Sequence, residues 1–358
     1  MSLENIIVSL SSSIRTVMTC IDRGTRGIAL IVDEQRHLLT TITDGDVRRA
    51  ILAGLDLDAP IEKLIEHKKN NPMYHPPVIA QDSITKALML AIMERNAVQQ
   101  LPLVDEKFRV VGIVGISELL GAQPRLPVQA VVMAGGFGIR LRPLTEDIPK
   151  PMLPVGDRPL LEHILINMRR AGIDQVNVTT HYKPEKIREY FGDGRRFGIS
   201  LAYVNEVEPL GTAGALSLLE APNETLLVIN GDILTGVDFR AMLDFHQQHH
   251  ADLTVAVRQY DIRIPYGVLE CDGPFVKHLS EKPVHHYLVN AGIYLMEPAM
   301  YGFVPHNQRF DMTDLIQLLI DHGKSVISFP VVEYWLDIGQ HEDYQQAQED
   351  VANRRVVT

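Results

Sequence analysis

The chain has 358 residues, of which 46% are hydrophobic and 22% are charged, so it is long enough for two domains that each bury a core. Its formal net charge of −11 argues against binding to nucleic acid or to an anionic membrane surface, but is compatible with a local basic pocket for a nucleotide. Two distant cysteines exclude a disulfide framework, and no apolar run approaches the roughly 18 residues of a membrane span. Since the first residues also lack a signal-peptide pattern, we expect a soluble, cytoplasmic protein without nucleic-acid or membrane partners.

The first third of the chain contains an internal repeat. The sequence Ile31-Val-Asp-Glu recurs 72 residues later as Leu103-Val-Asp-Glu. Each copy is followed by a strand-like run, at residues 38–43 and 110–115, and then by the start of a helix. A further helix is predicted over residues 82–95, with Asp82 as its cap. Two copies of such a unit indicate mutual packing, because one copy alone could hardly bury its apolar face.

The repeated segments resemble the tandem CBS-domain pair. In that family a Thr or Ser and an Asp three positions later hold the phosphate and ribose of an adenine nucleotide. Thr43 and Asp46 match this pattern in the first copy, whereas the second copy has Gly115 and Glu118. The resemblance implies either an adenine nucleotide at Thr43 and Asp46 or a pair that serves only packing or dimerisation. We assign residues 1–122 to this pair, with repeats at about 1–66 and 67–122.

Strands and helices alternate in the rest of the chain. Two prolines in residues 123–128 indicate a linker, and residues 129–358 are predicted to form one domain. The predicted strands are 130–134, 176–180, 199–204 and 225–229, and the predicted helices are 159–171, 184–190, 212–219 and 341–353. This alternation predicts an α/β fold with a doubly wound, mostly parallel, Rossmann-like sheet that binds ligands at the carboxyl ends of its strands.

A glycine-rich loop follows the first strand of that domain. Residues 135–138 contain three glycines, whose backbone N–H groups can approach a phosphate closely, and Arg140, Arg142 and Lys150 add cations beside them. The loop lacks the Gly-Lys-Ser/Thr end of a Walker A motif and the third glycine of a dinucleotide fingerprint. The loop therefore predicts a polyphosphate site of another kind.

The complete loop is similar to the signature of the sugar-1-phosphate nucleotidylyltransferases. It reads Gly135-Gly-Phe-Gly-Ile-Arg-Leu-Arg-Pro-Leu-Thr, with Pro149-Lys-Pro-Met-Leu-Pro after it, and looks most like mannose-1-phosphate guanylyltransferase-like enzymes. Six further motifs occur in the family's order: Leu210-Gly-Thr-Ala-Gly-Ala-Leu, Asn230-Gly-Asp, Pro265-Tyr-Gly, Glu281-Lys-Pro, Val289-Asn-Ala-Gly-Ile-Tyr and Trp335-Leu-Asp-Ile-Gly. The resemblance implies an enzyme that joins a nucleoside triphosphate and a sugar-1-phosphate into an NDP-sugar and releases pyrophosphate.

The same resemblance implies roles for individual residues. Arg140 matches the arginine that holds the leaving pyrophosphate, and Lys150 matches the lysine that bridges the reacting phosphates. Asp232 and Asp337 match the two carboxylates that hold Mg²⁺, a hard ion suited to oxygen ligands. The implied nucleotide-binding positions are Ala134, Gly135, Gly136, Gly138, Glu206, Gly211 and Thr212. The implied sugar-phosphate-binding positions are Gly267, Glu281, Lys282 and Asn290. The family and the CBS pair both imply a homo-oligomer.

One residue bears on the choice of base. Family members that take uridine or thymidine nucleotides often carry Gln at the position of Glu206. A carboxylate accepts two hydrogen bonds and so matches the adjacent N–H and NH₂ donors of guanine. We therefore prefer GTP, with UTP, dTTP or CTP, a non-catalytic sugar-nucleotide sensor, and a solvent-facing Glu206 as the alternatives.

Three histidines form a tempting cluster late in the chain. His246, His249 and His250 have the helical spacing of metal ligands. They lie beside Gln247 and Gln248 near an expected helix end. We therefore interpret them as a solvent-exposed surface and not as a zinc site.

Overall fold

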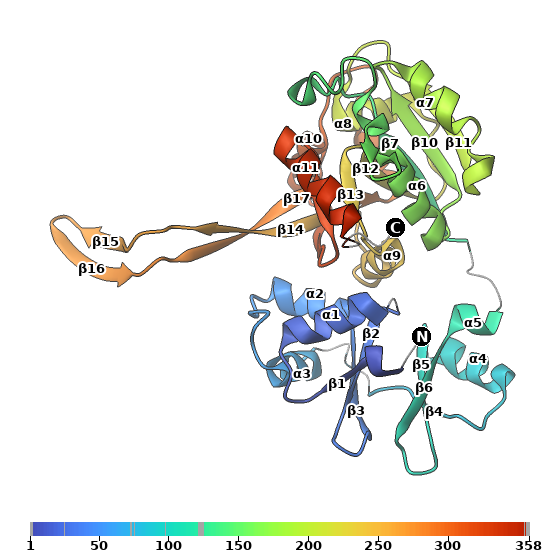
Figure 1. The fold of residues 1–358 in the computed structure, drawn as a ribbon, viewed down its shortest axis with the longest axis vertical. Coiled ribbons are helices and arrows are strands. Elements are labelled where there is room, and N and C mark those ends of the chain that lie inside the picture. Colours follow the sequence, from blue (N-terminus) through green and yellow to red (C-terminus); the bar gives the residue numbers. More distant parts are fainter. Residues whose placement is uncertain are drawn as a thin grey trace. The chain divides into compact units, whose positions relative to one another are not determined.

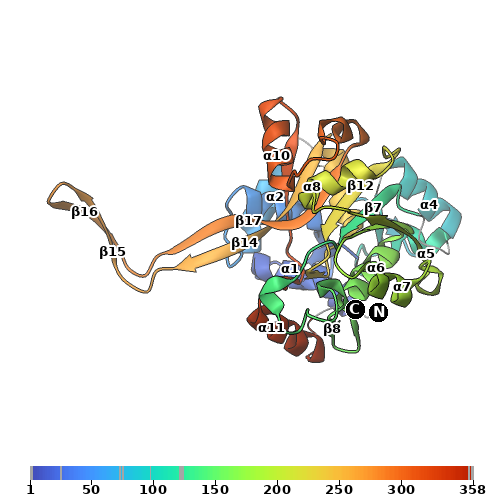
Figure 2. The same ribbon diagram turned by 90° about the horizontal axis from the view of Figure 1, so that it is seen from above.

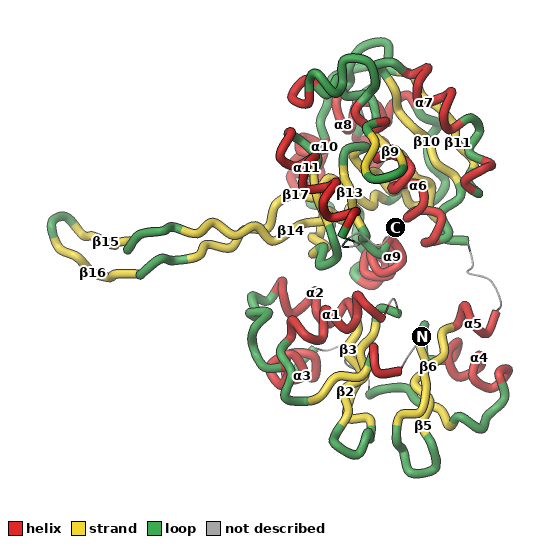
Figure 3. Tube along the Cα trace, viewed as in Figure 1, coloured by secondary structure: helices red, strands yellow, loops and turns green. Residues whose placement is uncertain are grey.

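The computed structural model describes residues 3–24, 26–71, 74, 76–96, 98–120, 125–353 and 355. The chain forms two compact units, whose elements are labelled in Figure 1 and coloured by type in Figure 3. The first comprises Met1–Leu126, Arg170–Ile173 and Asp238–Phe245, and the second comprises Pro127–Arg169, Asp174–Val237 and His246–Thr358. Part of the predicted linker lies outside the described residues, because 121–124 are not among them. In the described part of the chain, no helix has the length and apolar character needed to cross a membrane.

The first unit contains two three-stranded sheets with the strand orders β1-β2-β3 and β4-β5-β6. The strands are β1 (Ile7–Ser9), β2 (Ile28–Val32), β3 (Leu38–Thr43), β4 (Ala80–Gln81), β5 (Gln100–Val104) and β6 (Val110–Gly115). The helices are the 3₁₀-helix η1 (Leu3–Asn5) and the α-helices α1 (Ile14–Gly24), α2 (Asp44–Leu52), α3 (Ile61–Lys69), α4 (Lys86–Arg95) and α5 (Ile116–Leu120). The runs predicted at 38–43 and 110–115 are thus strands β3 and β6.

The hairpins β2–β3 and β5–β6 have equivalent registers. Ile28 lies opposite Thr43 and Gln100 lies opposite Gly115, which are the same two positions 72 residues apart. Both hairpins also shift register at the same place, between Ile31 and Val32 in the first and the corresponding residues of the second. This equivalence confirms the internal repeat.

The two copies pack against each other. An antiparallel bridge joins His37 to Arg109, and the Val110 N–H donates to the Arg36 carbonyl oxygen over 2.9 Å. A buried cluster also draws on both copies, with Ile6, Ile28, Leu30, Val32 and Val110 as its members. The predicted mutual packing is therefore confirmed, and it removes apolar surface of both copies from water.

The start predicted for α4 is wrong. The helix begins at Lys86, because the Thr85 hydroxyl accepts a hydrogen bond from the Leu88 N–H at 3.3 Å. The backbone N–H of Asp82 instead donates to the Val104 carbonyl oxygen over 3.1 Å and continues the pairing of β4 with β5. A hydroxyl three residues further on takes the capping position that the sequence suggested for Asp82.

The second unit is built on a seven-stranded sheet with the order β11-β10-β7-β12-β17-β14-β18. Its strands are β7 (Val128–Met133), β10 (Gln175–Thr180), β11 (Ser200–Asn205), β12 (Thr225–Asn230), β14 (Leu253–Arg263), β17 (Val284–Met296) and β18 (Val326–Pro330). β17 alone is antiparallel to its neighbours β12 and β14, while all other pairings are parallel. The predicted mostly parallel α/β sheet is confirmed.

Smaller elements occur in the same stretch of the chain, of which residues 170–173 and 238–245 belong to the first unit. The paired short strands are β8 (Pro154–Val155) with β9 (Arg158–Pro159), β13 (Ile233–Thr235) with β19 (Trp335–Asp337), and β15 (Val268–Asp272) with β16 (Phe275–Ser280). The α-helices are α6 (Leu160–Ala171), α7 (Pro184–Phe191), α8 (Gly211–Gly214), α9 (Phe239–Gln248), α10 (Met312–Asp321) and α11 (His341–Ala352). The 3₁₀-helices are η2 (Ile139–Leu141), η3 (Lys150–Met152), η4 (Arg195–Phe197), η5 (Ala215–Leu218) and η6 (Pro298–Phe303).

Side chains on both faces of the central strand β7 are buried, as the apolar run predicts. Ala130, Val131 and Val132 are all inaccessible to solvent. On the face that includes Val131, side chains of α8, η5, η6 and α10 complete a single apolar core with those of β12, β14 and β17. This core fixes the strands whose carboxyl ends carry the candidate site.

A long two-stranded arm, which the sequence did not predict, projects from the sheet (Figures 1 and 2). β14 and β17 remain paired beyond the sheet up to Arg263 and Val284, and β15 and β16 extend the ribbon to its tip. We define residues 260–287 as the arm. The sheet strand β18 pairs with β14 only as far as Val257, so the arm is a ribbon of two strands.

The prediction for His246 is wrong. Its side chain is 1% exposed and not at a wet surface. Nδ1 lies 2.7 Å from Oγ1 of Thr254, and Nε2 lies 3.0 Å from Oε1 of Glu297. Thr254, in β14, and Glu297, directly after β17, therefore satisfy both ring nitrogens of the buried His246, whereas His249 and His250 are exposed as expected.

Candidate active site

The glycine loop leaves the carboxyl end of β7 and is held there by its two neighbouring strands. The Ala134 N–H donates to the Thr179 carbonyl oxygen over 3.0 Å, and the Gly231 N–H donates to the Met133 carbonyl oxygen over 2.8 Å. Gly138 has a φ of 61°, which favours glycine, and its carbonyl oxygen accepts from the Thr145 hydroxyl at 2.8 Å. The loop is thus fixed in place with its amides at the strand ends, where parallel sheets bind ligands.

The four predicted catalytic residues lie together beside this loop. Lys150, in η3, is 8% exposed, and its Nζ lies 2.6 Å from Oδ2 of Asp232 at the end of β12. β13 pairs with β19 so that Ile233 faces Asp337, and the Ile338 N–H donates to the Asp232 carbonyl oxygen. The two carboxylates are therefore neighbours although they lie 105 positions apart in the sequence.

The charges in this cluster act on one another. Burial raises the pKa of Asp337, the Asp232 carboxylate raises it further, and Lys150 and Arg140 oppose the shift without cancelling it. Two neighbouring carboxylates in a partly buried place favour an additional cation. The described residues hold no group of three or more His, Cys, Asp or Glu side chains that could bind a metal ion. A divalent ion held by two carboxylates and by substrate phosphates fits this donor set.

Glu206 lies against the glycine loop and does not face solvent. It is 6% exposed, and its Oε2 accepts a hydrogen bond from the Leu210 N–H at 3.1 Å. A Cβ at Gly135 would lie 2.5 Å from Oε1 of Glu206, so this second oxygen is directed at the loop. The carboxylate therefore has one oxygen fixed by the backbone and the other directed at the glycine loop.

Gly211 and Thr212 perform a packing role in the structure. Gly211 has a φ of +80°, and a Cβ there would lie 2.5 Å from Oδ1 of Asp311. The Thr212 N–H donates to the same Asp311 oxygen at 3.0 Å, and the Thr212 hydroxyl accepts from the Met312 N–H at 2.9 Å. These contacts join the start of α8 to the start of α10. Direct contact of either residue with a nucleotide stays a prediction.

The predicted sugar-phosphate residues are divided between two places. Asn290, in β17, lies near the site: its Oδ1 accepts from the Gly292 N–H at 2.9 Å, and a Cβ at Gly292 would lie 2.7 Å from Nδ2 of Asn230. Gly267, Glu281 and Lys282 lie together on the arm instead. A Cβ at Gly267 would be 3.0 Å from Oε2 of Glu281, whose other oxygen is 4.0 Å from Nζ of Lys282.

These three arm residues are not brought to the catalytic cluster of their own chain. Asn290 lies six positions after Val284 along β17, so Lys282 lies more than about 20 Å along an extended strand from Asn290. Within one chain, Asn290 therefore lies apart from the other three residues, and contact of any of the four with a sugar phosphate stays a prediction. The motif identifies the residues but not the direction in which their hairpin runs.

No role was predicted for Phe137 of the glycine loop or for two residues that support it, His181 and Tyr182. The Phe137 ring packs edge-on against His181, with centroids 5.2 Å apart, and 5.8 Å from the ring of Tyr182. The Tyr182 hydroxyl donates to the Thr145 and Glu146 carbonyl oxygens at 3.2 and 3.0 Å. His181 and Tyr182 directly follow β10, so the rule that ligands bind at the carboxyl ends of parallel strands could have found them.

No role was predicted for Asn230, the last residue of β12. Its Oδ1 is buried and has no hydrogen-bond partner among the described residues. A buried, unsatisfied amide oxygen costs free energy unless a partner arrives with a ligand. Its place directly before Gly231 and Asp232 was the available signal.

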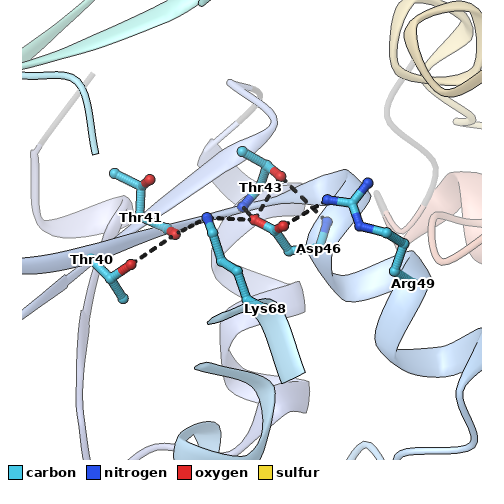
Figure 4. A network of polar contacts seen from close by, with 6 residues as sticks. All are labelled: Thr40, Thr41, Thr43, Asp46, Arg49 and Lys68. Atoms are coloured by element: carbon cyan, nitrogen blue, oxygen red, sulfur yellow. Dashed lines mark hydrogen bonds and ion pairs between the residues drawn. The ribbon is translucent and has the colours of Figure 1, made fainter. Parts of the chain in front are cut away.

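The predicted CBS ligand residues form a closed polar network (Figure 4). Oδ2 of Asp46 accepts from the Thr43 N–H and hydroxyl at 2.9 and 2.8 Å and from Lys68 at 2.8 Å, while Oδ1 accepts from Arg49 at 2.7 Å. Burial acts to raise the pKa of Asp46, but Lys68, the Thr43 N–H and Arg49 outweigh it, so this pKa lies below its ordinary value. Both oxygens of the carboxylate are satisfied within the protein.

The second copy has the same contact between a backbone N–H and a carboxylate, but it has no hydroxyl there, because Gly115 replaces Thr43. Glu118 accepts from the Gly115 N–H at 3.0 Å, as Asp46 does from Thr43. Its carboxylate also binds the Arg26 guanidinium through two hydrogen bonds at 2.6 and 3.1 Å, which hold the pKa of Glu118 below its ordinary value. Arg26 belongs to the first copy, so this departure from the CBS pattern joins the two copies.

Comparison with known proteins identifies both parts of the chain. The sequence profile of the nucleotidyl transferase family matches residues 129–354, and the CBS domain profile matches residues 72–125. The chain is 34% identical over 233 residues to the mannose-1-phosphate guanylyltransferase of Mycobacterium tuberculosis, which covers 63% of this chain and 64% of the relative. It is 34% identical over 227 residues to the D-glycero-alpha-D-manno-heptose 1-phosphate guanylyltransferase of Aneurinibacillus thermoaerophilus, which covers 63% and 98%.

A relative with a different base in its name is almost as similar. The UTP–glucose-1-phosphate uridylyltransferase of Synechocystis is 32% identical over 250 residues, and the match covers 64% of each chain. The chain therefore spans about 64% of the length of the Mycobacterium and Synechocystis relatives. Overall similarity does not by itself choose between guanine and uracil.

Two solved structures share the fold, and the sequence matches fix the family. A putative glucose-1-phosphate thymidylyltransferase from Bacillus anthracis, in complex with a sucrose, has a TM-score of 0.52 at 24% identity and covers 64% of this chain and 96% of its own. HddC from Yersinia pseudotuberculosis, complexed with GMP-PN, has a TM-score of 0.50 at 26% identity and covers 63% and 100%. Because the family profile matches more than half of its residues, this chain belongs to the nucleotidyl transferase family.

Proposed function

We propose that this chain transfers a nucleoside monophosphate, preferably from GTP, to a sugar-1-phosphate and releases pyrophosphate. The observation that carries the proposal is the cluster of Lys150, Asp232 and Asp337 at the strand ends beside the glycine loop. Backbone amides, cations and a pair of carboxylates are the groups that phosphoryl transfer needs, since its catalysis rests on positioning and on charge stabilisation. The names of the guanylyltransferase relatives agree with this reaction.

The reaction requires no nucleophilic side chain. An oxygen of the sugar-1-phosphate forms a bond to the α-phosphorus, the bond from that phosphorus to the bridging oxygen of the β-phosphate breaks, and the electron pair leaves with pyrophosphate. In the proposal, Lys150 stabilises the negative charge on the reacting phosphate and Arg140 holds the pyrophosphate. A phosphate dianion is already a nucleophile, so no general base is assigned.

We assign Asp232 and Asp337 to binding Mg²⁺. When bound, the ion would neutralise charge on the phosphate oxygens. The raised pKa of Asp337 supports the assignment, because a cation between two neighbouring carboxylates offsets their repulsion. Lys150 would keep Asp232 oriented toward the same phosphates.

We assign the choice of base to Glu206. Its Oε2 is fixed by the Leu210 N–H, while its Oε1 points to the glycine loop and can accept hydrogen bonds from guanine. Uracil and thymine present carbonyl oxygens beside one donor, so a buried carboxylate would be left partly unpaired, which costs about 1–3 kcal/mol. UTP and dTTP are therefore expected to be poorer substrates than GTP.

The test is a matrix of incubations with one nucleoside triphosphate and one sugar-1-phosphate each, followed by pyrophosphate release. The proposal expects product with GTP and with at least one sugar-1-phosphate, and Asp337→Asn as an inactive control. If no pair gives pyrophosphate while a sugar nucleotide still binds, the chain is a sensor and not an enzyme. If UTP reacts faster than GTP, the assignment of Glu206 is wrong.

For the CBS pair, we propose packing as the role of Thr43 and Asp46. Both oxygens of Asp46 already accept hydrogen bonds within the network of Figure 4, whereas a ribose diol would need an acceptor of its own. Calorimetric titration of the full chain with ATP tests this. Binding that is lost in Thr43→Val would establish an adenine-nucleotide site instead.

A further inference from the structure

We infer that the arm reaches a second copy of this chain and that Glu281 and Lys282 of one copy complete the active site of the other. The inference rests on the proposed function, because it concerns the sugar-phosphate half of that site. The arm then has a second copy of this chain as its partner, and each complete active site contains residues of two chains.

The first observation is that the site of one chain is incomplete. In the proposed function, the triphosphate and the metal ion are bound by Arg140, Lys150, Asp232 and Asp337. The cation proposed for the sugar phosphate, Lys282, is 68% exposed in its side chain, and its nearest ion-pair partner is Glu281 at 4.0 Å. A site that must bind two anionic substrates thus lacks one of its cations.

The second observation is that the pairing of the arm opposes folding back onto its own chain. The ladder between β14 and β17 runs without a register shift from Arg258 opposite Val289 to Arg263 opposite Val284. The Ile264 N–H then donates to the Pro283 carbonyl oxygen over 3.0 Å, and the His286 ring lies 2.6 Å from the Asp261 carboxylate. Bending the ribbon back by a half-turn would break this continuous ladder.

The third observation is that the arm exposes large apolar side chains on a ribbon that projects from the sheet. Tyr266, Leu269, Phe275, Val276 and Leu279 are exposed, with Phe275 at 70%. A two-stranded ribbon is marginally stable by itself in water, and a contiguous exposed apolar surface marks an interaction site. The arm therefore needs a partner surface.

The rim of the active site supplies such a surface. Phe137, Ile139 and Leu144, in and just after the glycine loop, are large apolar side chains that are also exposed. An arm that packs on this rim would bring Lys282 and Glu281 next to the catalytic cluster. The apolar rim and the catalytic cluster of the arm's own chain are out of its reach, because the β14–β17 ladder keeps the arm extended. Another copy of this chain carries the same rim beside the same cluster, so we take that copy as the partner. Exchange of identical arms about a twofold axis closes the assembly as a dimer.

The decisive test purifies mixed dimers from cells that express two differently tagged variants. One variant carries Lys282→Ala in the arm, and the other carries Asp232→Asn in the body. If arms are exchanged, one of the two sites has an intact body and an intact arm, so the mixed dimer has about half of the wild-type activity. If each arm serves its own chain, both sites are defective, and activity no higher than that of the single variants overturns the inference.

A matched control replaces the other lysine of the arm. Lys277 is exposed and pairs with Asp272 at 3.4 Å. A mixed dimer of Lys277→Ala with Asp232→Asn retains about half of the activity in either geometry, since one site keeps all proposed groups. An inability to purify any mixed dimer would overturn the inference, because a monomer cannot exchange arms.

A cross-linking measurement keeps this inference separate from the proposed function. A benzophenone amino acid replaces Lys282, and equal amounts of isotopically light and heavy chains are assembled together and irradiated. Cross-links between light and heavy peptides near Asp232 or Phe137 support the exchange even when no substrate pair is found. Cross-links confined to peptides of one chain overturn it. A wild-type protein without activity would refute only the proposed function.

Discussion

The contact between Gly135 and Glu206 gives a prediction that can be worked out from distances. In Gly135→Ala, the new Cβ would lie 2.5 Å from Oε1 of Glu206, whereas real Cβ contacts are essentially never under 3.0 Å. The buried carboxylate must therefore move and lengthen its 3.1 Å hydrogen bond from Leu210. A strained core and a weakened buried hydrogen bond cost about 1–3 kcal/mol, so we expect Gly135→Ala to lower the free energy of unfolding by about 2 kcal/mol.

The neighbouring Gly136 is a matched control. A Cβ at Gly136 meets nothing within 4 Å, and neither glycine has a positive φ. Gly136→Ala is expected to leave the free energy of unfolding unchanged or to raise it by about 0.4–1 kcal/mol, because alanine restricts the unfolded chain. Both substitutions change the unfolded chain in the same way, so their difference isolates the collision with Glu206.

Urea unfolding followed by tryptophan fluorescence measures these free energies. Trp335 is the single tryptophan of the chain, and its Nε1–H donates to the Ala291 carbonyl oxygen at 2.8 Å beside the candidate site. The signal therefore reports on the second unit. In a Glu206→Ala background the Gly135→Ala cost should shrink by at least about 1 kcal/mol. Equal effects of the two glycine substitutions, or an unchanged cost in that background, would refute the placement of Glu206.

Three further predictions concern charged groups. Lys150→Met should lower the rate of nucleotide transfer by about 100- to 1,000-fold, because it removes the cation proposed to stabilise developing charge. The control Lys186→Met, on the exposed face of α7, should leave the rate unchanged, and similar rates for both variants would contradict the role of Lys150. Asp337→Asn should abolish transfer but raise the melting temperature of the metal-free protein at pH 7, because the raised pKa of Asp337 means that its ionised carboxylate destabilises the folded state. The gain in melting temperature should fade toward about pH 4, near the ordinary pKa of aspartate, and a lower melting temperature at pH 7 would contradict the reasoning. Asp46→Asn should destabilise the first unit by about 1–3 kcal/mol at neutral pH. The lowered pKa of Asp46 means that its carboxylate stabilises the fold at pH values above the ordinary aspartate pKa, and this stability is lost as the pH falls through the folded-state pKa. Hydrogen exchange of peptides from residues 38–70 measures the effect, and unchanged protection would count against the network.

Much of the fold could be predicted because local patterns determine it. The strands β3 and β6 follow from apolar runs with β-branched residues, and the repeat offset places them as equivalent hairpins. The strand and helix alternation after residue 129 leads to the parallel part of the sheet. The start of α4 was misplaced because Asp82 and Thr85 are both good caps, and only the pairing of β4 with β5 decides between them.

The candidate site was predictable where its residues follow strands of the parallel sheet. Lys150, Asp232 and Asp337 meet because the glycine loop and the pairing of β13 with β19 bring distant segments together. Gly267, Glu281 and Lys282 were identified by a motif, but the direction of their hairpin depends on tertiary pairing that the motif does not encode. The environment of His246 was misjudged because its partners, Thr254 in β14 and Glu297 directly after β17, are distant in the sequence and the local helix pattern does not reveal them.

The most direct measurement of the central claim follows the phosphates of GTP. Wild-type protein is incubated with a reactive sugar-1-phosphate and with GTP that is labelled at either the α- or the γ-phosphate. The account predicts that the α-label appears in the sugar nucleotide, that the γ-label appears in pyrophosphate, and that both products disappear in Asp337→Asn. Release of the γ-label as inorganic phosphate, or its transfer to the sugar, would contradict nucleotidyl transfer at this site.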